Sequence, residues 1–508
     1  MAALLITLLL LNAVFNLVTW PTAQASPGAP ARPHARTARR TTVGRMHGTL
    51  ALLTAWLARQ RWFAGTAASP RLRVLADREL ATDDPAARVR LLVLVDEAPE
   101  PRVVYQVPLV ERATAGVAAA GEGFIGLRED GVALIDGPHD PAFTAALLSL
   151  VAPAAPPSTA EVLRGEQSNT SIIFRAVDPA PDRTPVICKV FRVLHPGLNP
   201  DIELQSALSA AGSPHVPRVV GRLDGSWRDP DFAAEQADAP NTLDAPDAAL
   251  HGSLAFAQEF YPGVEDAWRV ALRSARGGVD FADAADALGR ATADVHLDLA
   301  RLFPHPEATP DQRATLVAAW HRRLRIALAE VPQLAPWADD IRHRYTAAEA
   351  APWPRLQRVH GDYHLGQVLQ VPGRGWVLLD FEGEPMRPMG ERSAPDLALR
   401  DVAGMLRSFD YVEGSLTLAR SQTTGLDADA RGLDAQEDAD DDRARAWAVS
   451  ARTAFLAGYR AGSGASPEGA LLDALELDKA VYEAIYEARH RPAWLPIPLA
   501  AVARLATR

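Results

Sequence analysis

The sequence predicts an α+β protein of more than one domain, with strands in the first half of the chain and helices in the second. Three observations lead to this prediction. The chain has 508 residues, which is more than a single hydrophobic core usually supports. Between Arg71 and Tyr261, short runs rich in β-forming residues alternate with turn residues. After Tyr261, the apolar residues recur mainly at helical spacing.

Residues 46–155 are predicted to form a small α/β subdomain. Met46–Arg61 is expected to be an amphipathic helix, because its leucines recur at helical spacing. The expected elements that follow are strands at Arg71–Ala76, Ala87–Val95 and Arg102–Val110, an apolar run at Leu134–Gly137, and a helix through Phe143–Val151. The Pro-rich run Ala152–Pro157 then marks a domain boundary.

Residues 156–262 are predicted to form a second, strand-rich lobe, and residues 263–508 a mainly helical one. The expected elements of the second lobe are strands Ile172–Arg175, Val186–Phe191 and Leu254–Tyr261, and a helix Asn199–Ala211 with Asn199 as its cap. Pro262 and Gly263 would form a hinge. In the helical lobe, the acidic insert Asp427–Asp442 is expected to be a solvated loop.

Composition excludes some functions. The net charge of −11 argues against nucleic acid as a partner, because phosphate backbones select basic surfaces. The single cysteine, Cys188, excludes an intramolecular disulfide and a thiolate metal cluster. Cys188 lies in an apolar run, so a buried thiol in a strand is expected. A reducing compartment, the cytoplasm, fits this usage.

The N-terminal residues 1–45 resemble an incomplete export signal. Leu4–Trp20 is apolar and Ala23–Ala25 resembles a signal-peptidase site, but no Lys or Arg precedes the apolar run. We therefore expect a mis-assigned start or disordered leader, with Met46 as the true initiator and no membrane association. A mature N-terminus near Ser26, found by mass spectrometry of the native protein, would refute this expectation.

The residues that point to chemistry lie between positions 359 and 384. Asp362 stands in a polar loop, Gln367 follows five residues later, and Asp380 ends the short apolar strand Trp376–Leu379. Phosphoryl transfer from ATP needs one carboxylate to accept the proton of the attacking hydroxyl and oxygen ligands for magnesium. Asp362 is therefore the candidate catalytic base. The alternative for this residue is a turn-capping aspartate.

Gln367 and Asp380 are the candidate Mg²⁺ ligands, because Mg²⁺ prefers oxygen donors and needs few protein groups beside phosphates and water. The alternatives are a surface amide and a strand-end cap. Glu382 either assists the metal or forms an ion pair with Arg387 or Arg392.

Lys189 is the candidate for binding the α- and β-phosphates, since a lysine inside an apolar strand is otherwise unusual. An edge-strand lysine with its charged end in water is the alternative. Glu203, on the following helix, is either its ion-pair partner or a surface residue. Further nucleotide contacts are expected from the turn Gly165–Ser171, with Ser168 and Ser171, and from the strand end, with Glu259 and Tyr261.

Six motifs together resemble one family: Gln60–Gly65, Gly165–Ser171, His360–Gln367, Leu379–Pro385, Arg400–Phe409 and Glu476–Pro492. The chain resembles the bacterial maltokinases, a branch of the aminoglycoside-phosphotransferase-like proteins. The resemblance implies a bilobal protein-kinase-like fold with an additional N-terminal α/β cap subdomain and a mainly helical C-terminal lobe.

The resemblance also implies a reaction: ATP- and Mg²⁺-dependent phosphorylation of maltose at its anomeric hydroxyl, giving maltose 1-phosphate for α-glucan synthesis. Trehalose synthase would be a functional partner. The implied sugar contacts are His364, Lys479, Tyr482, Glu483, Tyr486 and Arg489. Tyr482, Tyr486 and Arg489 share one face at i, i+4, i+7 spacing, although a helix-packing face is the alternative for the tyrosines.

Two other functions fit the same motifs. The first is a kinase acting on an aminoglycoside or choline-type substrate, which an acidic pocket would favour. The second is a non-catalytic pseudokinase partner of trehalose synthase. The presence of Lys189, Asp362, Gln367 and Asp380 argues against the second.

Overall fold

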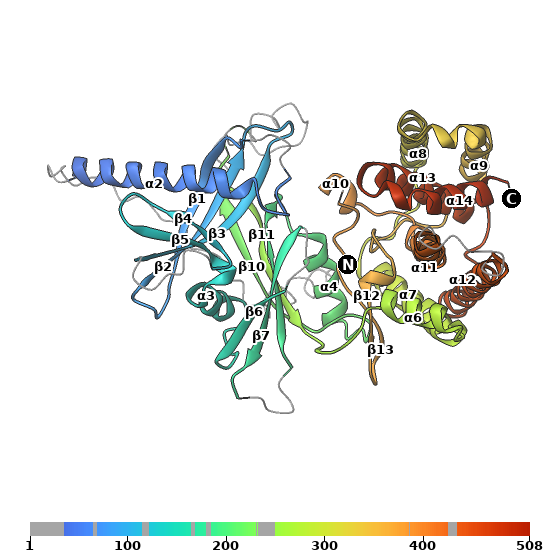
Figure 1. Ribbon diagram of the computed structural model, residues 1–508, viewed down its shortest axis with the longest axis horizontal. Helices are drawn as coiled ribbons and strands as arrows, with labels where there is room; N and C mark the ends of the chain where they lie inside the picture. Colours follow the sequence, from blue (N-terminus) through green and yellow to red (C-terminus); the bar gives the residue numbers. More distant parts are fainter. Residues whose placement is uncertain are drawn as a thin grey trace, which may run out of the picture. The chain divides into compact units, whose positions relative to one another are not determined.

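The computed structural model describes most of the chain, and the chain forms two compact units (Figure 1). Unit 1 comprises Met1–Asn199 and Arg218–Phe260, and unit 2 comprises Pro200–Pro217 and Tyr261–Arg508. The described residues are 35–64, 69–113, 121–163, 168–178, 184–229, 231, 249–385, 387–424 and 434–507. Most of the predicted leader, residues 1–34, therefore lies outside the described residues.

The first sheet of unit 1 is antiparallel and packs against helix α2 (Ala35–Leu57). Its strands are β1 (Leu72–Leu80), β2 (Ala87–Asp96), β3 (Val103–Ala113), β4 (Phe124–Leu127), β5 (Val132–Asp136) and β9 (Val193–Leu194). They run in the order β1-β2-β3-β5-β4, with β9 paired to β3. The core forms where Leu53, Trp56 and Leu57 of α2 meet apolar side chains of β2 and β3.

The predicted helix Met46–Arg61 has the wrong bounds. Helix α2 begins earlier, at Ala35, because no proline interrupts the chain after Pro33. It ends earlier, at Leu57, because the chain turns there and Trp62 packs on Trp56 and Tyr105.

The second sheet of unit 1 is also antiparallel. Its strands are β6 (Ser158–Val162), β7 (Asn169–Ala176), β8 (Val186–Phe191), β10 (Val219–Trp227) and β11 (Leu250–Glu259), in the order β10-β11-β8-β7-β6. Helix α3 (Pro141–Val151) contacts strands of both sheets. The predicted strands of this region are confirmed, whereas the short β4 and β9 and the polar β10 were not predicted.

Unit 2 is mainly helical, as predicted. Its helices are α4 (Pro200–Ala210), α6 (Ala267–Gly277), α7 (Ala282–Leu302), α8 (Pro310–Glu330), α9 (Ala338–Ala350), α10 (Met389–Arg392), α11 (Leu399–Thr424), α12 (Asp434–Ser463), α13 (Ala470–His490) and α14 (Pro496–Ala506). A hairpin of β12 (Val368–Val371) and β13 (Gly375–Leu378) carries the end of the predicted catalytic loop. Helices α7 and α12 touch at bare backbone, since a Cβ on Gly289 would lie 2.1 Å from the carbonyl oxygen of Phe455.

The prediction of a solvated loop at Asp427–Asp442 is wrong for its second half. Helix α12 already begins at Asp434, whereas residues 425–433 lie outside the described residues. The acidic residues of this half stand at the start of the helix, where the helix dipole favours negative charge, and the segment holds no proline or glycine.

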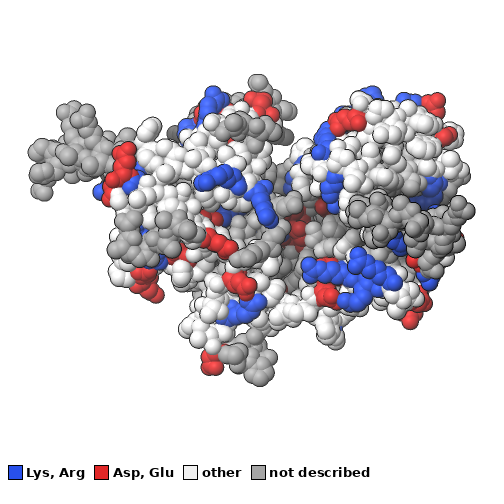
Figure 2. All heavy atoms as spheres, in the orientation of Figure 1, with Lys and Arg blue, Asp and Glu red and all other residues white. Residues whose placement is uncertain are grey.

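The face of the molecule drawn in Figure 2 is mixed in charge. On the face drawn in Figure 2, acidic and basic side chains are interspersed among uncharged ones. Among the described residues, no helix combines the length and apolarity that crossing a membrane requires.

Candidate active site

The loop that carries Asp362 is fixed by one buried carboxylate in unit 2. The backbone N–H groups of His360 and Gly361 donate to the two oxygens of Asp401 at 2.8 and 2.9 Å. Asp401 lies on α11 and is 1% exposed. Because both oxygens are used by adjacent amides, the loop backbone immediately before Asp362 has a defined conformation.

A histidine supports this carboxylate from a second helix. His296 of α7 places its Nε2 3.0 Å from Asp401, and its Nδ1 lies 3.0 Å from the Tyr459 hydroxyl. Burial alone would raise the pKa of Asp401, but the hydrogen bonds from His296 and from Gly361 outweigh it and hold this pKa below its usual range. Asp401 therefore stays ionised and keeps accepting the two backbone hydrogen bonds from the loop.

The loop is also packed closely against α11. A Cβ on Gly404 would lie 2.5 Å from the carbonyl oxygen of Tyr363, so only glycine permits this approach. The Leu365 N–H donates to the Ser408 hydroxyl at 3.0 Å, and the Tyr363 hydroxyl lies 2.8 Å from that of Thr292. The loop that presents Asp362 is thus held on both sides.

Asp380, one of the two predicted metal ligands, lies beside the other. The Gln367 amide donates to Asp380 Oδ2 at 3.0 Å. Asp380 has a φ of 63°, and among the described residues it is the only one other than glycine with a positive φ. Such a conformation is costly for most side chains and is often found at functional sites.

Asp201 of α4 is a further carboxylate beside Asp380. Its Oδ1 accepts the Phe381 N–H at 2.7 Å, directly after Asp380. Oxygen atoms of Asp201, Asp380 and Glu382 lie within 4.8 Å of one another. Carboxylate and amide oxygens are the donors that Mg²⁺ prefers, so this group fits the ion that the sequence implies.

His364 is a further ionisable residue of this loop. Burial lowers the pKa of His364, and the negative charges of Asp362 and Asp380 oppose that lowering. Its Nδ1 accepts the Gly366 N–H at 3.0 Å.

A cavity of about 480 Å³ lies beside Asp362. Its walls include four of the predicted sugar residues on α13 and the predicted His364, together with aromatic and hydroxyl side chains. The lining residues are Trp268, Asp362, His364, Gly366, Pro385, Gly404, Ser408, Tyr411, Lys479, Tyr482, Glu483, Tyr486, Glu487, Arg491 and Trp494. Aromatic faces beside hydrogen-bonding groups suit a polyhydroxylated ligand.

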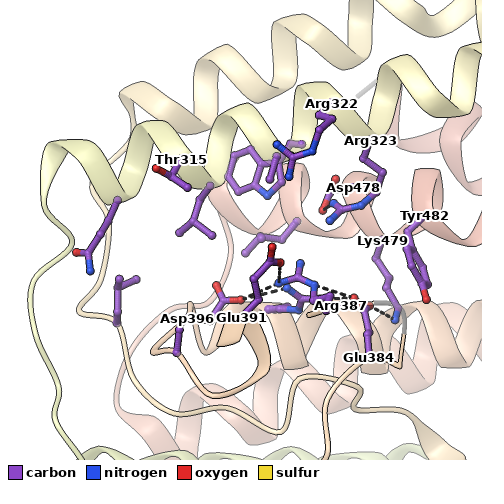
Figure 3. Close-up of a pocket in the computed structure, with 18 of the residues that line it drawn as sticks. Thr315, Arg322, Arg323, Glu384, Arg387, Glu391, Asp396, Asp478, Lys479 and Tyr482 are labelled. Atoms are coloured by element: carbon purple, nitrogen blue, oxygen red, sulfur yellow. Dashed lines mark hydrogen bonds and ion pairs between the residues drawn. The ribbon is translucent and has the colours of Figure 1, made fainter. Parts of the chain in front are cut away.

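A second cavity of about 340 Å³ shares Lys479 and Tyr482 with the first (Figure 3). Figure 3 shows Glu384 between Lys479 and Arg387, with which it forms ion pairs of 2.6 and 3.1 Å. Arg400 also contacts Glu384. The walls of this cavity therefore combine paired charges with apolar side chains such as Trp320 and Leu356.

The candidate nucleotide residues lie on the second sheet of unit 1. Lys189 on β8 is directly opposite Ser171 on β7, so both belong to one face of the sheet. Ser168 lies just before β7, and residues 164–167 of the predicted turn lie outside the described residues. Glu259 ends β11, whereas Tyr261 belongs to unit 2.

Comparison with known proteins identifies the N-terminal part. Residues 56–140 match the family described as the maltokinase N-terminal cap domain. A glucosamine kinase from Streptacidiphilus jiangxiensis is 31% identical over 308 residues, which are 56% of this chain and 64% of that protein. One from Mycolicibacterium smegmatis is 37% identical over 151 residues, or 29% and 33% of the two chains. The chain thus spans less than two thirds of the length of these curated relatives.

Solved structures identify the fold. A glucosamine kinase in complex with glucosamine, ADP and inorganic phosphate has a TM-score of 0.57 and 24% identity, over 90% of this chain and 98% of that one. Another crystal form has a TM-score of 0.58 and 23% identity, over 90% and 97%. The chain therefore resembles the maltokinases in its cap segment and has a kinase-like fold. The predicted resemblance and fold class are thereby confirmed.

Two predicted residues have partners outside the expected sites. Arg489 does not line the cavity beside Asp362 and instead binds Glu330 of α8 at 2.6 and 2.7 Å. Glu203 forms an ion pair with Arg358 within unit 2. The ion pair expected between Glu203 and Lys189 stays a prediction, because the two residues belong to different units.

Several residues of the candidate site were not predicted. Asp401 lies in the motif Arg400–Phe409, but the sequence assigned it no role. Asp201 lies 179 positions before Asp380 and stands in a predicted helix with no motif around it. Trp268 and Trp494 join the cavity from α6 and from the segment before α14. Sequence periodicity carries no signal for contacts of this range.

Proposed function

We propose that the chain transfers the γ-phosphoryl group of ATP to a sugar hydroxyl, with the anomeric hydroxyl of maltose as acceptor and maltose 1-phosphate as product. The observation that carries this proposal is the position of Asp362 on the wall of a cavity that also holds Tyr482, Tyr486 and Trp494. A carboxylate on a rigid loop beside aromatic faces suits an alcohol nucleophile on a sugar ring.

Each group of the site has a role in this reaction. Asp362 accepts the proton of the attacking hydroxyl. Asp380 and Gln367, with Asp201 and Glu382 at the same position, would hold Mg²⁺, which when bound neutralises phosphate charge. Lys189, Ser168 and Ser171 are proposed to bind the phosphates, and the strand end at Glu259 and Tyr261 the adenine.

The charge balance of the cavity favours a neutral acceptor. Glu483 is held by Arg407 at 2.8 Å, and Glu487 by Arg491 at 2.6 Å. Burial also raises the pKa of Glu483, which further disfavours its charged form. The strongly acidic pocket that a cationic aminoglycoside or choline-type substrate would select is therefore not favoured by these pairings.

A second acceptor, glucosamine, is suggested by the relatives, which are named glucosamine kinases. Asp362 lines the cavity, and its carboxylate offers an acceptor for the amino group. The reaction would be the same, with a monosaccharide in place of maltose.

The test is a panel of acceptors offered to the purified chain with ATP and Mg²⁺. ADP release is measured with maltose, glucose, glucosamine and kanamycin, and ³¹P NMR locates the phosphate in the product. We expect the highest kcat/KM with maltose and a phosphate on its anomeric carbon. Activity with glucosamine alone would assign the second acceptor, and activity with kanamycin alone would remove sugars as substrates.

Two variants connect this panel to the site. Asp362→Asn should lower kcat by about a hundredfold or more, as expected for loss of a general base. Unchanged turnover in Asp362→Asn would remove it as the base, and no turnover by the unaltered chain would favour a pseudokinase. Tyr486→Ala should raise the KM for the sugar, whereas Trp353→Phe, which lies outside the cavity, should not.

The cytoplasmic location and the functional link to trehalose synthase remain proposals that rest on the maltose reaction. A pull-down with purified trehalose synthase and the Asp362→Asn variant would test a physical association separately from turnover.

A further inference from the structure

One arginine of unit 1 joins the cap to the sheet of the proposed nucleotide site. Arg192 directly follows β8, the strand of Lys189, and is 1% exposed. Two of its nitrogens donate to the two oxygens of Asp136 at 2.9 and 2.6 Å, and its Nε donates to the Thr170 hydroxyl at 2.8 Å. The Trp62 ring lies 4.8 Å from the guanidinium carbon.

These four residues come from different parts of unit 1. Asp136 ends strand β5 of the first sheet, and Trp62 follows helix α2. Both lie in the segment that matches the maltokinase cap domain. Thr170 lies on β7 in the second sheet, next to Ser171, and Ser171 is the strand partner of Lys189. A single guanidinium therefore connects the cap to the strand that follows the proposed phosphate turn.

The backbone makes a second connection at the same place. The Gln106 side chain on β3 donates to the carbonyl oxygens of Phe191 and Leu254 at 2.8 and 2.9 Å. The Gln106 N–H donates to the Arg192 carbonyl at 2.8 Å. Strand β3 of the cap thus satisfies the polar groups where β8 ends and where β11 runs beside it.

We propose that the cap positions the nucleotide-binding strands, and that Arg192 is the positioning residue that transmits this effect. The proposal rests on the proposed function, since it takes β7 and β8 as the strands that bind ATP. Burial makes the contact specific. The Arg192 guanidinium has five donors and three acceptor atoms around it, so it has one favourable orientation. Strands β5 and β7 must therefore keep the positions that place Asp136 and Thr170 around it. The cap then acts on ATP binding without touching ATP.

A matched control lies in the first sheet of unit 1. Arg90 on β2 is 5% exposed and binds Asp77 and Glu111, which both belong to the cap. It is a buried arginine between carboxylates, as Arg192 is, but it makes none of its described contacts with β7 or β8. Loss of Arg192 should destabilise the fold because the buried Asp136 loses its guanidinium partner. Loss of Arg90 should do so because the buried Glu111 keeps only the longer contacts with Arg88 and Arg128. Only loss of the Arg192 contact should weaken nucleotide binding.

The experiment uses the full chain and separates nucleotide binding from stability. Arg192→Gln, Thr170→Val and Arg90→Gln are compared with the unaltered protein for Tm, for KM of ATP and of the sugar, and for Mg·ADP affinity by calorimetry. We expect Thr170→Val and Arg192→Gln to raise the KM for ATP by about fivefold to tenfold, the scale of one or two buried hydrogen bonds, with little change in the sugar KM. Arg192→Lys should restore part of the loss.

Arg90→Gln should lower Tm and leave the KM for ATP unchanged. Equal losses of Tm with an unchanged KM for ATP in all variants would overturn the inference and leave the cap a purely structural addition. If Arg192→Gln does not fold, Thr170→Val, which removes a single hydroxyl, decides the question. Absence of Mg·ADP binding by the unaltered protein would instead overturn the proposed function, and this inference with it.

Discussion

Lys479 on α13 places its Nζ 2.6 Å from Oε1 of Glu384, and the same nitrogen lies 3.4 Å from Oδ1 of Asp362. Burial would lower the pKa of Lys479, but Glu384 and Asp362 raise it above its usual range. The lysine is therefore a permanent positive charge between a structural carboxylate and the proposed base. The sequence predicts Lys479 as a sugar contact, and the structure adds a contact with the base.

We expect Lys479→Met to lower kcat by about tenfold to a hundredfold, because the side chain of Asp362 loses the charge that orients it. Lys479→Arg should keep the charge and retain more of the activity. Steady-state kinetics with ATP and the sugar varied in turn would measure this. A rise in the sugar KM with no change in kcat would leave Lys479 as a sugar contact alone.

Asp401→Asn should weaken the catalytic loop as well as the fold. An amide cannot accept hydrogen bonds from His360, Gly361 and His296 with both of its polar atoms, so buried donors lose their partner. We expect a loss of about 1–3 kcal/mol in the free energy of unfolding, and a lower kcat with little change in either KM. Chemical denaturation and kinetics would measure both, with the exposed Asp339→Asn as control.

Acid should have a related effect on the unaltered protein. The pKa of Asp401 is lower in the folded chain than in the unfolded one, so the unfolded chain binds more protons as pH falls. Its contribution to stability is complete above the usual aspartate pKa of about 3.9 and is lost as pH falls from there through the folded value. Asp401→Asn should show a smaller acid-induced loss in this window.

The sequence is informative about the local parts of the candidate site, for a physical reason. Lys479, Tyr482 and Tyr486 are on one helix, where spacing alone decides which side chains share a face. Asp362 and Asp380 are tied to a loop and a strand end that composition reveals. Asp201 and Asp401 were not assigned roles, because their contacts join segments whose separation leaves no periodic trace.

The errors have equally specific causes. Helix α2 starts before Met46 because the segment between Pro33 and Met46 contains no proline, and its single Gly44 is tolerated inside the helix. The acidic insert was taken as a loop from its charge, but charge repulsion is weaker than helix propensity when alanines alternate with the acids. Arg489 has the predicted spacing, yet its long side chain reaches Glu330 instead of the cavity.

The metal prediction concerns two carboxylates with different roles. Asp380→Ala should abolish turnover and weaken Mg·ATP binding, because a direct ligand is lost. Asp201→Asn should raise the Mg²⁺ concentration needed for half-maximal rate, because the Phe381 N–H loses a charged acceptor and the segment holding Asp380 loosens. A magnesium titration of the initial rate would measure both, with the exposed Asp339→Asn as control. Equal magnesium curves for Asp201→Asn and the unaltered protein would leave Asp201 outside the metal site.

Cys188 should be inert to alkylation in the folded protein. It lies on β8 with 0% exposure, and burial raises the pKa of its thiol from 9.0 to about 12. Iodoacetamide at pH 8, followed by mass spectrometry of the intact chain, should label Cys188 only when denaturant is present.

The raised pKa of Cys188 also predicts an alkaline effect on stability. The folded chain keeps the thiol proton at pH values where the unfolded chain has lost it. This contribution to the free energy of unfolding is therefore complete below pH 9 and is lost as pH rises toward 12. Cys188→Ala cannot titrate, so its free energy of unfolding should fall less steeply over that range, although it starts lower because a buried group is missing. Rapid labelling without denaturant would contradict a buried thiol beside Lys189, and parallel pH profiles for the two proteins would contradict the raised pKa.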